Sequence, residues 1–275
     1  MSLVLLLSSL FHFLISLQPA SPSRYAPELF PDHLSGAVCG YSEDGQIIYF
    51  VREDATLDKL LIYQATKVEG RWTDEKKLHF SGDYDDMGGR LTPNGTTFYF
   101  TSNRPHPDPD ITDDWNIWRS DFDGQEWSQA YPSRVNSNRE ECCPTPIGDR
   151  LLFSANVNDT LEWQMLGMDA VEALNITNAW QWPSYFDQET GFLFFNSMKR
   201  RDTLGKDDIY ASKFDGSSWG PIINLGPLVN SEIYEDGAIV SADRQWLIFN
   251  QHTSSGPSMV MCLPLGQVMN LLNHP

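Results

Sequence analysis

The feature that most constrains the fold is a pattern that returns about every 50 residues. Clear copies start with a tight turn, continue into a short aromatic strand and a second strand, and reach Trp after a glycine turn. The starting turns lie at residues 44–45, 94–95, 147–148, 190–191 and 243–244. Four short strands and their turns fill such a period, which is the size of one β-propeller blade. The chain is therefore predicted to form an all-β, single propeller of five four-stranded blades.

The two clearest copies run over residues 91–127 and 189–226, whereas the third and fifth copies are weaker. Asp-Gly and Asn-Gly turns supply the positive φ that tight hairpins need. The aromatic and β-branched runs after them suit half-buried strands that pack blade against blade. Trp72, Trp127 and Trp219 recur in register, so we interpret them as structural residues.

The two ends of the chain offer a way to close the ring. The last copy stops before a fourth strand, while residues 28–31 precede the first copy. The N-terminal segment is therefore predicted to supply the outer strand of the last blade, which removes a sheet edge. The tail, 267–275, could complete that blade instead, and leftover segments could form a sixth. Apart from the N-terminal segment, only residues 168–174 show any helical periodicity.

The repeated residues resemble the TolB-type β-propeller repeat, a relative of the WD repeat, over about residues 25–265. The resemblance implies a propeller fold and leaves function open among binding proteins, propeller parts of peptidases and polysaccharide-degrading enzymes. The matching stretches are Thr92-Pro93-Asn94-Gly95, Phe100-Thr101-Ser102-Asn103-Arg104, Asp208-Ile209-Tyr210, Trp219, Asn224-Leu225-Gly226, Val135-Asn136-Ser137 with Glu140-Glu141, and Val229-Asn230-Ser231 with Glu235-Asp236-Gly237.

The first 23 residues are uncharged and hold an apolar core at Leu3–Leu17, followed by small residues. This core is shorter than the roughly 20 apolar residues of a membrane span. Residues 1–23 are therefore predicted to be a signal peptide, and residues 24–275 the propeller domain. Because no Lys or Arg lies near the start, an N-terminal anchor is the alternative. The protein is expected to be secreted or periplasmic.

The charge balance limits the possible partners. With 19 Lys and Arg against 37 Asp and Glu, the net charge is −18, which repels nucleic acid and anionic membranes. We expect a monomer that meets no membrane beyond its N-terminal segment. No cofactor is predicted, although clustered carboxylates could bind Ca²⁺.

The four cysteines match no zinc pattern and are too few for a disulfide scaffold. We interpret them as small buried residues on strands. A strained disulfide between Cys142 and Cys143 is the alternative for the adjacent pair.

A propeller restricts where a binding site can lie. The loop that enters the innermost strand of each blade and the loop after its second strand share one face, around the channel mouth. Here those loops gather carboxylates, a few cations and two tryptophans, with His252 on the same face. The candidate ligand-binding residues are Asp83, Asp85, Asp86, Arg104, Glu140, Glu141, Trp180, Trp182, Glu235 and Asp236.

The favoured function is a non-catalytic binding or scaffold module for a protein, peptide or glycan at this face, since exposed aromatic rings among polar groups are common anchors. The alternative is a glycoside hydrolase or polysaccharide lyase, because glycoside cleavage needs two carboxylates at a defined separation. A third possibility is a structural module that joins a complex through its blade edges. The carboxylates available to an enzyme would be Asp86, Glu140, Glu141 and Asp236.

Overall fold

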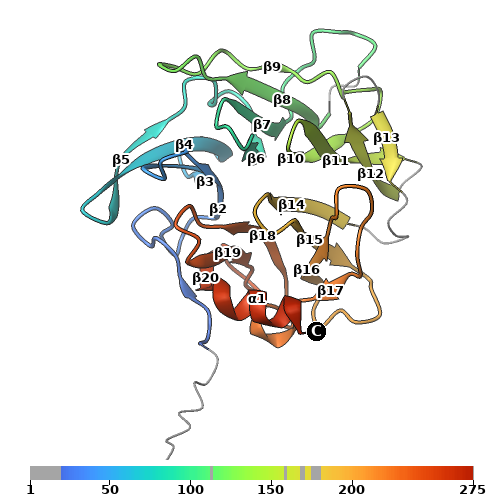
Figure 1. The fold of residues 1–275 in the computed structure, drawn as a ribbon. Coiled ribbons are helices and arrows are strands. Elements are labelled where there is room, and N and C mark those ends of the chain that lie inside the picture. The colour runs from blue at the N-terminus through green and yellow to red at the C-terminus, as the bar shows by residue number, and fades with distance from the viewer. Residues whose placement is uncertain (1–19, 112–113, 158–159, 168–170, 175–180, 275) are drawn as a thin grey trace, which may run out of the picture.

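The computed structural model describes residues 20–111, 114–157, 160–167, 171–174 and 181–274. Five four-stranded antiparallel sheets surround a central axis, which confirms the predicted five-bladed propeller (Figure 1). Blade 1 contains β2 (Gly36–Tyr41), β3 (Ile47–Asp54), β4 (Lys59–Val68) and β5 (Arg71–Lys77). Blade 2 contains β6 (Asp86–Leu91), β7 (Thr97–Ser102), β8 (Asn116–Asp121) and β9 (Tyr131–Pro132). Blade 3 contains β10 (Glu141–Ile147), β11 (Arg150–Val157), β12 (Thr160–Leu166) and β13 (Val171–Leu174).

The last two blades complete the ring. Blade 4 contains β14 (Gln181–Asp187), β15 (Phe192–Met198), β16 (Asp207–Lys213) and β17 (Ile223–Asn224), and a 3-10 helix (Gly226–Leu228) follows it. Blade 5 contains β18 (Glu235–Val240), β19 (Trp246–Gln251) and β20 (Met259–Pro264) from the C-terminal part, with β1 (Ser23–Arg24) as its outer strand.

The N-terminal segment closes the last blade, as predicted, but by a strand further upstream than residues 28–31. Ser23 pairs with Cys262, and Arg24 pairs with Met261. Residues 28–31 instead contribute to the core, where Phe30 is 1% exposed. An apolar residue that the repeat pattern would place in an outer strand is thus buried between blades 1 and 5.

The tail does not complete the last blade, which was the alternative to closure by the N-terminal segment. The tail forms α1 (Leu265–Asn273), whose Leu265, Val268 and Leu272 are buried on one face and pack against the core of blade 5. Residues 168–174 show some helical periodicity in the sequence, but their described part, Val171–Leu174, pairs with β12 as β13. A nine-residue helix is stabilised by such tertiary packing rather than by its own propensity, so a short tail gives little sequence signal.

The repeated turns explain the repeated sequence. Ser42 and Thr92 each accept a hydrogen bond through the hydroxyl from the backbone amide five residues on, at 2.9 and 3.0 Å. The glycine of each turn, Gly45 or Gly95, has a φ of +68°, which a residue with a Cβ adopts only at a cost. The Ser/Thr-x-Asp/Asn-Gly pattern is therefore the local code for the turn between the first and second strands.

The core lies between neighbouring blades. Aromatic side chains of the second strands are fully buried there, among them Phe98, Phe100 and Phe194 at 0% exposure. Trp127 is 6% exposed and packs edge-on against Tyr49 of blade 1, at 5.6 Å between ring centroids. Burial of each such side chain contributes about 1.5–3 kcal/mol. The structural role predicted for the recurring tryptophans is confirmed.

Candidate functional site

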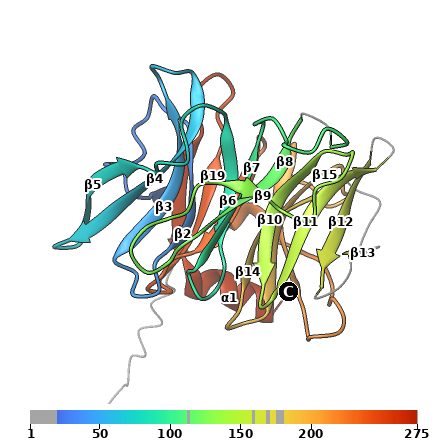
Figure 2. The ribbon, with the colours of Figure 1, turned by 90° about the horizontal axis from the view of Figure 1, so that it is seen from above.

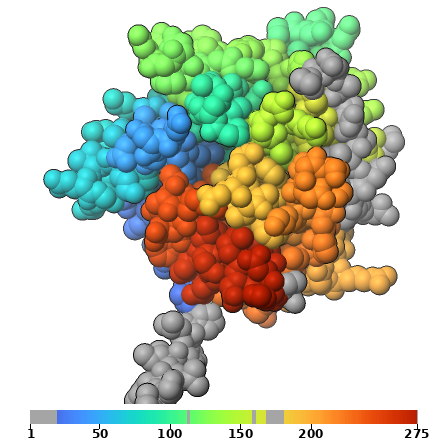
Figure 3. Space-filling model, in the orientation of Figure 1, coloured from blue at the N-terminus to red at the C-terminus, as the bar shows by residue number. Residues whose placement is uncertain are grey.

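The propeller has two faces, which the strands connect (Figure 2). We call the face with the loops before the innermost strands and after the second strands the entry face; it is the face on which the sequence places a site. We call the opposite face, formed by the turns between first and second strands, the turn face. Helix α1 begins at the turn face, since Leu265 bonds to Gln245 in the last of these turns. The space-filling view shows the helix on the surface of that face (Figure 3).

Glu141, a predicted site residue on the entry face, holds the entering loop of blade 3 in place. It is 1% exposed, and its carboxylate accepts hydrogen bonds from the hydroxyl and the backbone amide of Ser137 at 2.5 and 3.3 Å. The preceding Asn136 side chain bonds both the amide and the carbonyl of Ile117, at 2.9 Å each. The stretch therefore fastens the entering loop of blade 3 to the third strand of blade 2.

The same device recurs at Glu235, which is 0% exposed. Its carboxylate accepts a hydrogen bond from the backbone amide of Ser231 at 2.8 Å and another from Gln251 at 3.1 Å. Asn230 bonds the amide and carbonyl of Ile209 at 2.8 and 3.0 Å. The Asn-Ser-x-x-x-Glu spacing thus encodes a loop attachment, and its glutamate is held by the protein itself.

Asp86 occupies the equivalent position in blade 2 and is also fully buried, at 0% exposure. It accepts hydrogen bonds from Ser81 and from Arg104, both at 2.6 Å. The guanidinium of Arg104 lies over the ring of Trp118, 5.1 Å from its centroid. Burial raises the pKa of Asp86, although the charge of Arg104 opposes that rise. The two predicted site residues are brought together, but as a buried ion pair.

The other predicted residues are more scattered. Asp83 is exposed, and Asp85 is half-buried with its carboxylate accepting the amide of Leu60 in β4 at 2.9 Å. Glu140 is half-buried directly before β10, and Trp182 is half-buried within β14. Trp180 lies outside the described residues.

Asp236 differs from the buried acids because its side chain is 35% exposed. One of its carboxylate oxygens lies 2.9 Å from Nε2 of His252, and the other accepts a hydrogen bond from Asn250 at 2.7 Å. The hydrogen bond to Asp236 raises the pKa of His252. The entry face between blades 4 and 5 therefore presents a partly exposed Asp–His pair.

Asp207, the first residue of β16, lies beside this pair and was missed by the sequence reasoning. It is 6% exposed, and Oδ2 accepts a hydrogen bond from Asn196 at 2.6 Å. Its Oδ1 is buried and has no hydrogen-bond partner among the described residues. Burial raises the pKa of Asp207 to about 7, and the negative charge of Asp236 adds to the rise. An unpartnered buried acceptor is costly, which marks this carboxyl as a functional candidate.

The sequence feature that could have identified Asp207 is the pair of adjacent aspartates that it forms with Asp208. Asp208 has a local task, because its carboxylate accepts hydrogen bonds from the amides of Leu204 and Gly205 at 2.7 and 3.0 Å. Asp207 has no such loop to hold. Ile117 and Ile209 are equivalent in the repeat, so the place of Asp207 is taken by Trp115 in the second copy, and the repeat does not require an acid there.

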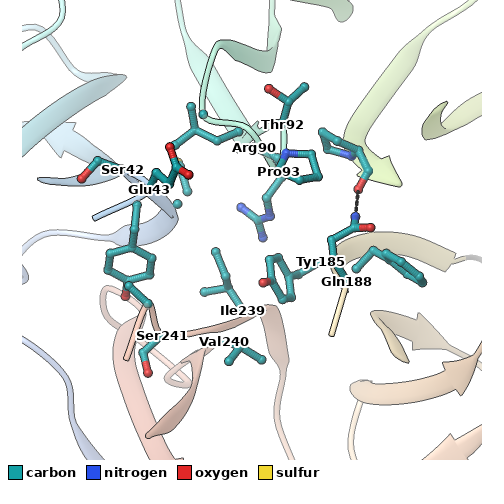
Figure 4. A pocket seen from close by; sticks show the side chains of 18 of the residues that line it. Ser42, Glu43, Arg90, Thr92, Pro93, Tyr185, Gln188, Ile239, Val240 and Ser241 are labelled. Carbon is teal, nitrogen blue, oxygen red and sulfur yellow. Dashed lines mark hydrogen bonds between the residues drawn. The ribbon is translucent and has the colours of Figure 1, made fainter. Parts of the chain in front are cut away.

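A second candidate lies on the turn face, where a central cavity of about 290 Å³ opens between all five innermost strands (Figure 4). Each of these strands has a register shift in its middle, and such bulges re-aim side chains. The residues that follow the shift pair with the third residue of each second strand and line the cavity: Gly40, Arg90, Thr145, Tyr185 and Ile239.

Arg90 is the charged member of this ring of five and was also missed. It is 7% exposed, and Nε donates to the carbonyl of Ser184 in blade 4 at 2.5 Å. Its Nη1 donates to the carbonyls of Gly89 and Val38 at 2.8 and 3.2 Å. No salt bridge reaches it from the described part of the chain. Burial lowers the pKa of Arg90.

The cysteines are free. Cys39 and Cys262 are buried as expected, whereas Cys142 and Cys143 are half-buried in the register shift of β10 and form no disulfide. In the residues that the structure covers, no group of three or more His, Cys, Asp or Glu side chains could hold a metal ion. The Ca²⁺ hypothesis therefore gains no ready-made site there.

Comparison with known proteins supports the fold alone. No protein-family model matches the chain, and no curated protein matches it by sequence. Among solved structures, an endo-arabinase from Bacteroides thetaiotaomicron superposes on this chain with a TM-score of 0.55 at 14% identity. The match covers 88% of this chain and 97% of the endo-arabinase chain. TolB from Acinetobacter baumannii superposes with a TM-score of 0.50 at 14% identity, covering 85% of this chain.

This chain spans 54% of the TolB chain and 40% of a prolyl endopeptidase that it also resembles, at 10% identity and a TM-score of 0.48. Among the described residues, no helix has the length and apolar character needed to cross a membrane. The chain is a β-propeller that resembles TolB propellers and other propeller proteins in structure, at low sequence identity.

Proposed function

We propose that the protein is an exported, secreted or periplasmic, monomeric binding module without catalytic activity. Its ligand is a glycan, bound on the entry face between blades 4 and 5. The observation that carries the proposal is the partly exposed Asp236–His252 pair, which lies beside the buried carboxyl of Asp207, whose Oδ1 has no partner among the described residues. A ligand hydroxyl can bond the partly exposed carboxylate of Asp236, whose negative charge also raises the pKa of the neighbouring Asp207.

The protonation of this pair favours hydroxyl groups. With a pKa of about 7, Asp207 is about half protonated at neutral pH and can donate a proton, while the carboxylate of Asp236 accepts one. A sugar hydroxyl both donates and accepts hydrogen bonds, whereas an ammonium group only donates. The ring of Tyr234, 5.6 Å from that of His252, adds an aromatic surface beside the carboxyl groups, of the kind that binding sites use as anchors.

The buried acids weigh against catalysis by the carboxylates first considered. Asp86 and Glu141 are at most 1% exposed and are hydrogen-bonded within the protein. Neither carboxylate can therefore reach a glycosidic bond without losing these internal hydrogen bonds. Asp207 keeps the enzyme alternative open, because a carboxyl with a pKa of about 7 beside an ionised one matches the acid and base of glycosidases.

A thermal-shift screen of the full chain against oligosaccharides and peptides tests the proposal. A ligand that binds only the folded state raises Tm. We expect an oligosaccharide to raise Tm for the wild type and for Asp74→Asn, an exposed control in β5, and to lose that effect with Asp207→Ala, which removes the donor. A shift with peptides alone would overturn the glycan assignment.

The same oligosaccharide separates binding from catalysis. Under the proposal, it is recovered intact after long incubation with the wild type. New reducing or unsaturated ends that vanish with Asp207→Asn would establish the glycoside hydrolase or lyase alternative instead.

A further inference from the structure

We propose that the turn-face cavity is a second ligand site, which binds a carboxylate through Arg90 and Tyr185. It lies on the opposite face of the ring from the Asp207 site and does not depend on it. The ring of five positions around the cavity contains one cation and no acid, the others being glycine, threonine, tyrosine and isoleucine.

The buried charge of Arg90 is only partly compensated. Backbone carbonyls from three blades accept hydrogen bonds from Nε and Nη1, which fixes the guanidinium in the cavity wall. Carbonyl dipoles satisfy donors but do not neutralise a positive charge, and an unpaired buried charge is costly. An anion in the cavity would supply the missing counter-charge.

The remaining donor of Arg90 is free to meet a ligand. Its Nη2 makes no hydrogen bond to any described residue. This nitrogen is not fully buried, so a ligand can reach it. The close-up shows the guanidinium directed into the centre of the cavity, with the phenol ring of Tyr185 beside it (Figure 4). Fixed guanidinium donors suit the planar oxygens of a carboxylate.

Tyr185 provides a second donor. Its hydroxyl has no hydrogen-bond partner in the described part of the chain, and it is not fully buried. Burial raises the pKa of Tyr185 to about 12, so the hydroxyl keeps its proton at ordinary pH. A hydroxyl donor and a guanidinium donor therefore converge on one space.

Besides Arg90, the charged residues that line the cavity are Arg244 and Glu43. Arg244 forms a bidentate ion pair with Asp187 at 2.8 and 2.9 Å and a further one with Glu189 at 2.8 Å. Glu43, on the turn of blade 1, is exposed at the rim. Because Arg244 is paired with Asp187 and Glu189, Arg90 is the cation without an ion-pair partner among the charged residues that line the cavity.

The cavity volume of about 290 Å³ limits the ligand to a small molecule or a chain end. A carboxylate could come from a free small acid or from the C-terminus of a peptide. Both share the group that Arg90 and Tyr185 would recognise, so the experiment contains an arm for each.

Isothermal titration calorimetry on the full chain tests the site, at constant ionic strength. The probes are sodium succinate and the tripeptide Gly-Gly-Gly with either a free or an amidated C-terminus, with sodium chloride as the reference. We expect binding of succinate, of the free-acid tripeptide, or of both, and none of the amidated tripeptide. Binding of succinate alone identifies a small acid, and stronger binding of the free tripeptide identifies a peptide end.

Two variants assign the binding to the cavity. Tyr185→Phe removes a hydroxyl with no protein partner, so it should fold and weaken binding about threefold to tenfold, while Tyr131→Phe in β9 leaves affinity unchanged. Arg90→Gln should weaken binding at least tenfold, judged only if its circular dichroism matches the wild type. No heat with either carboxylate, equal heat with the amidated tripeptide, or full affinity in Tyr185→Phe and a folded Arg90→Gln would overturn the proposal.

Discussion

Replacement of Asp207 by Asn should stabilise the protein in a pH-dependent way. The pKa of Asp207 is about 7 in the folded protein, against 3.8 for the ordinary carboxyl. The folded state therefore binds more protons than the unfolded state between these values, and the contribution of Asp207 to stability falls as pH rises through this window. A difference of about 3 pKa units corresponds to at most about 4 kcal/mol.

The variant removes this penalty because an amide stays neutral. Relative to the wild type, Asp207→Asn should gain little at pH 4 and about 2–4 kcal/mol at pH 8, most of it between pH 5 and pH 7. Urea unfolding of both proteins at pH 4, 6 and 8 measures the difference. Asp74→Asn, exposed in β5, is the control and should show no such trend.

The result that refutes the reasoning is a stability difference that does not change with pH. It would mean that Asp207 titrates like an exposed carboxyl. A difference that shrinks as pH rises would show that the folded state favours the ionised form, and the unpartnered oxygen would then need another explanation.

Three further predictions concern the fold. Gly89→Ala should destabilise the protein by about 1–3 kcal/mol in urea unfolding, because a Cβ there would lie 2.4 Å from the ring of Phe98; an unchanged midpoint would contradict this contact. Glu235→Ala should cost about 1–3 kcal/mol in the same assay by leaving the Ser231 amide and the Gln251 side chain unpaired, whereas Glu232→Ala in the same loop should cost nearly nothing. Deletion of the residues before Tyr25 removes β1 and should lower Tm relative to a chain starting at Ala20; equal Tm values would show that strand pairing does not close the ring.

The blade architecture was predictable because it rests on local chemistry that repeats. The turn at Gly45 and the turn at Gly95 use equivalent residues for the same hydrogen bonds, and the buried Phe50 and Phe100 follow them in register. Ring closure by a two-residue strand was predictable only in outline, because Ser23 and Arg24 carry no strand pattern of their own.

The candidate sites were harder to predict because residue type does not reveal burial or pairing. Glu141 and Glu235 are acids next to loops on a ligand-accessible face, yet the carboxylates of both accept hydrogen bonds from those loops and hold them in place. Arg90 lies on a strand that its sequence neighbours would place in the core, and the register shift turns it into the cavity. Asp207 became distinct only once Asp208 was seen to hold the adjacent loop.

The measurement that tests the central claim most directly is the titration of Asp207 in the full chain. The ¹³C shift of its carboxyl carbon would be followed from pH 3 to pH 9, with and without a saturating oligosaccharide. We predict a midpoint near pH 7 for the free protein and a higher midpoint in the complex, because a hydroxyl that accepts from Asp207 and donates to Asp236 favours the protonated form. A midpoint near the ordinary 3.8, or one that the oligosaccharide leaves unchanged, would contradict the assignment of this carboxyl to ligand binding.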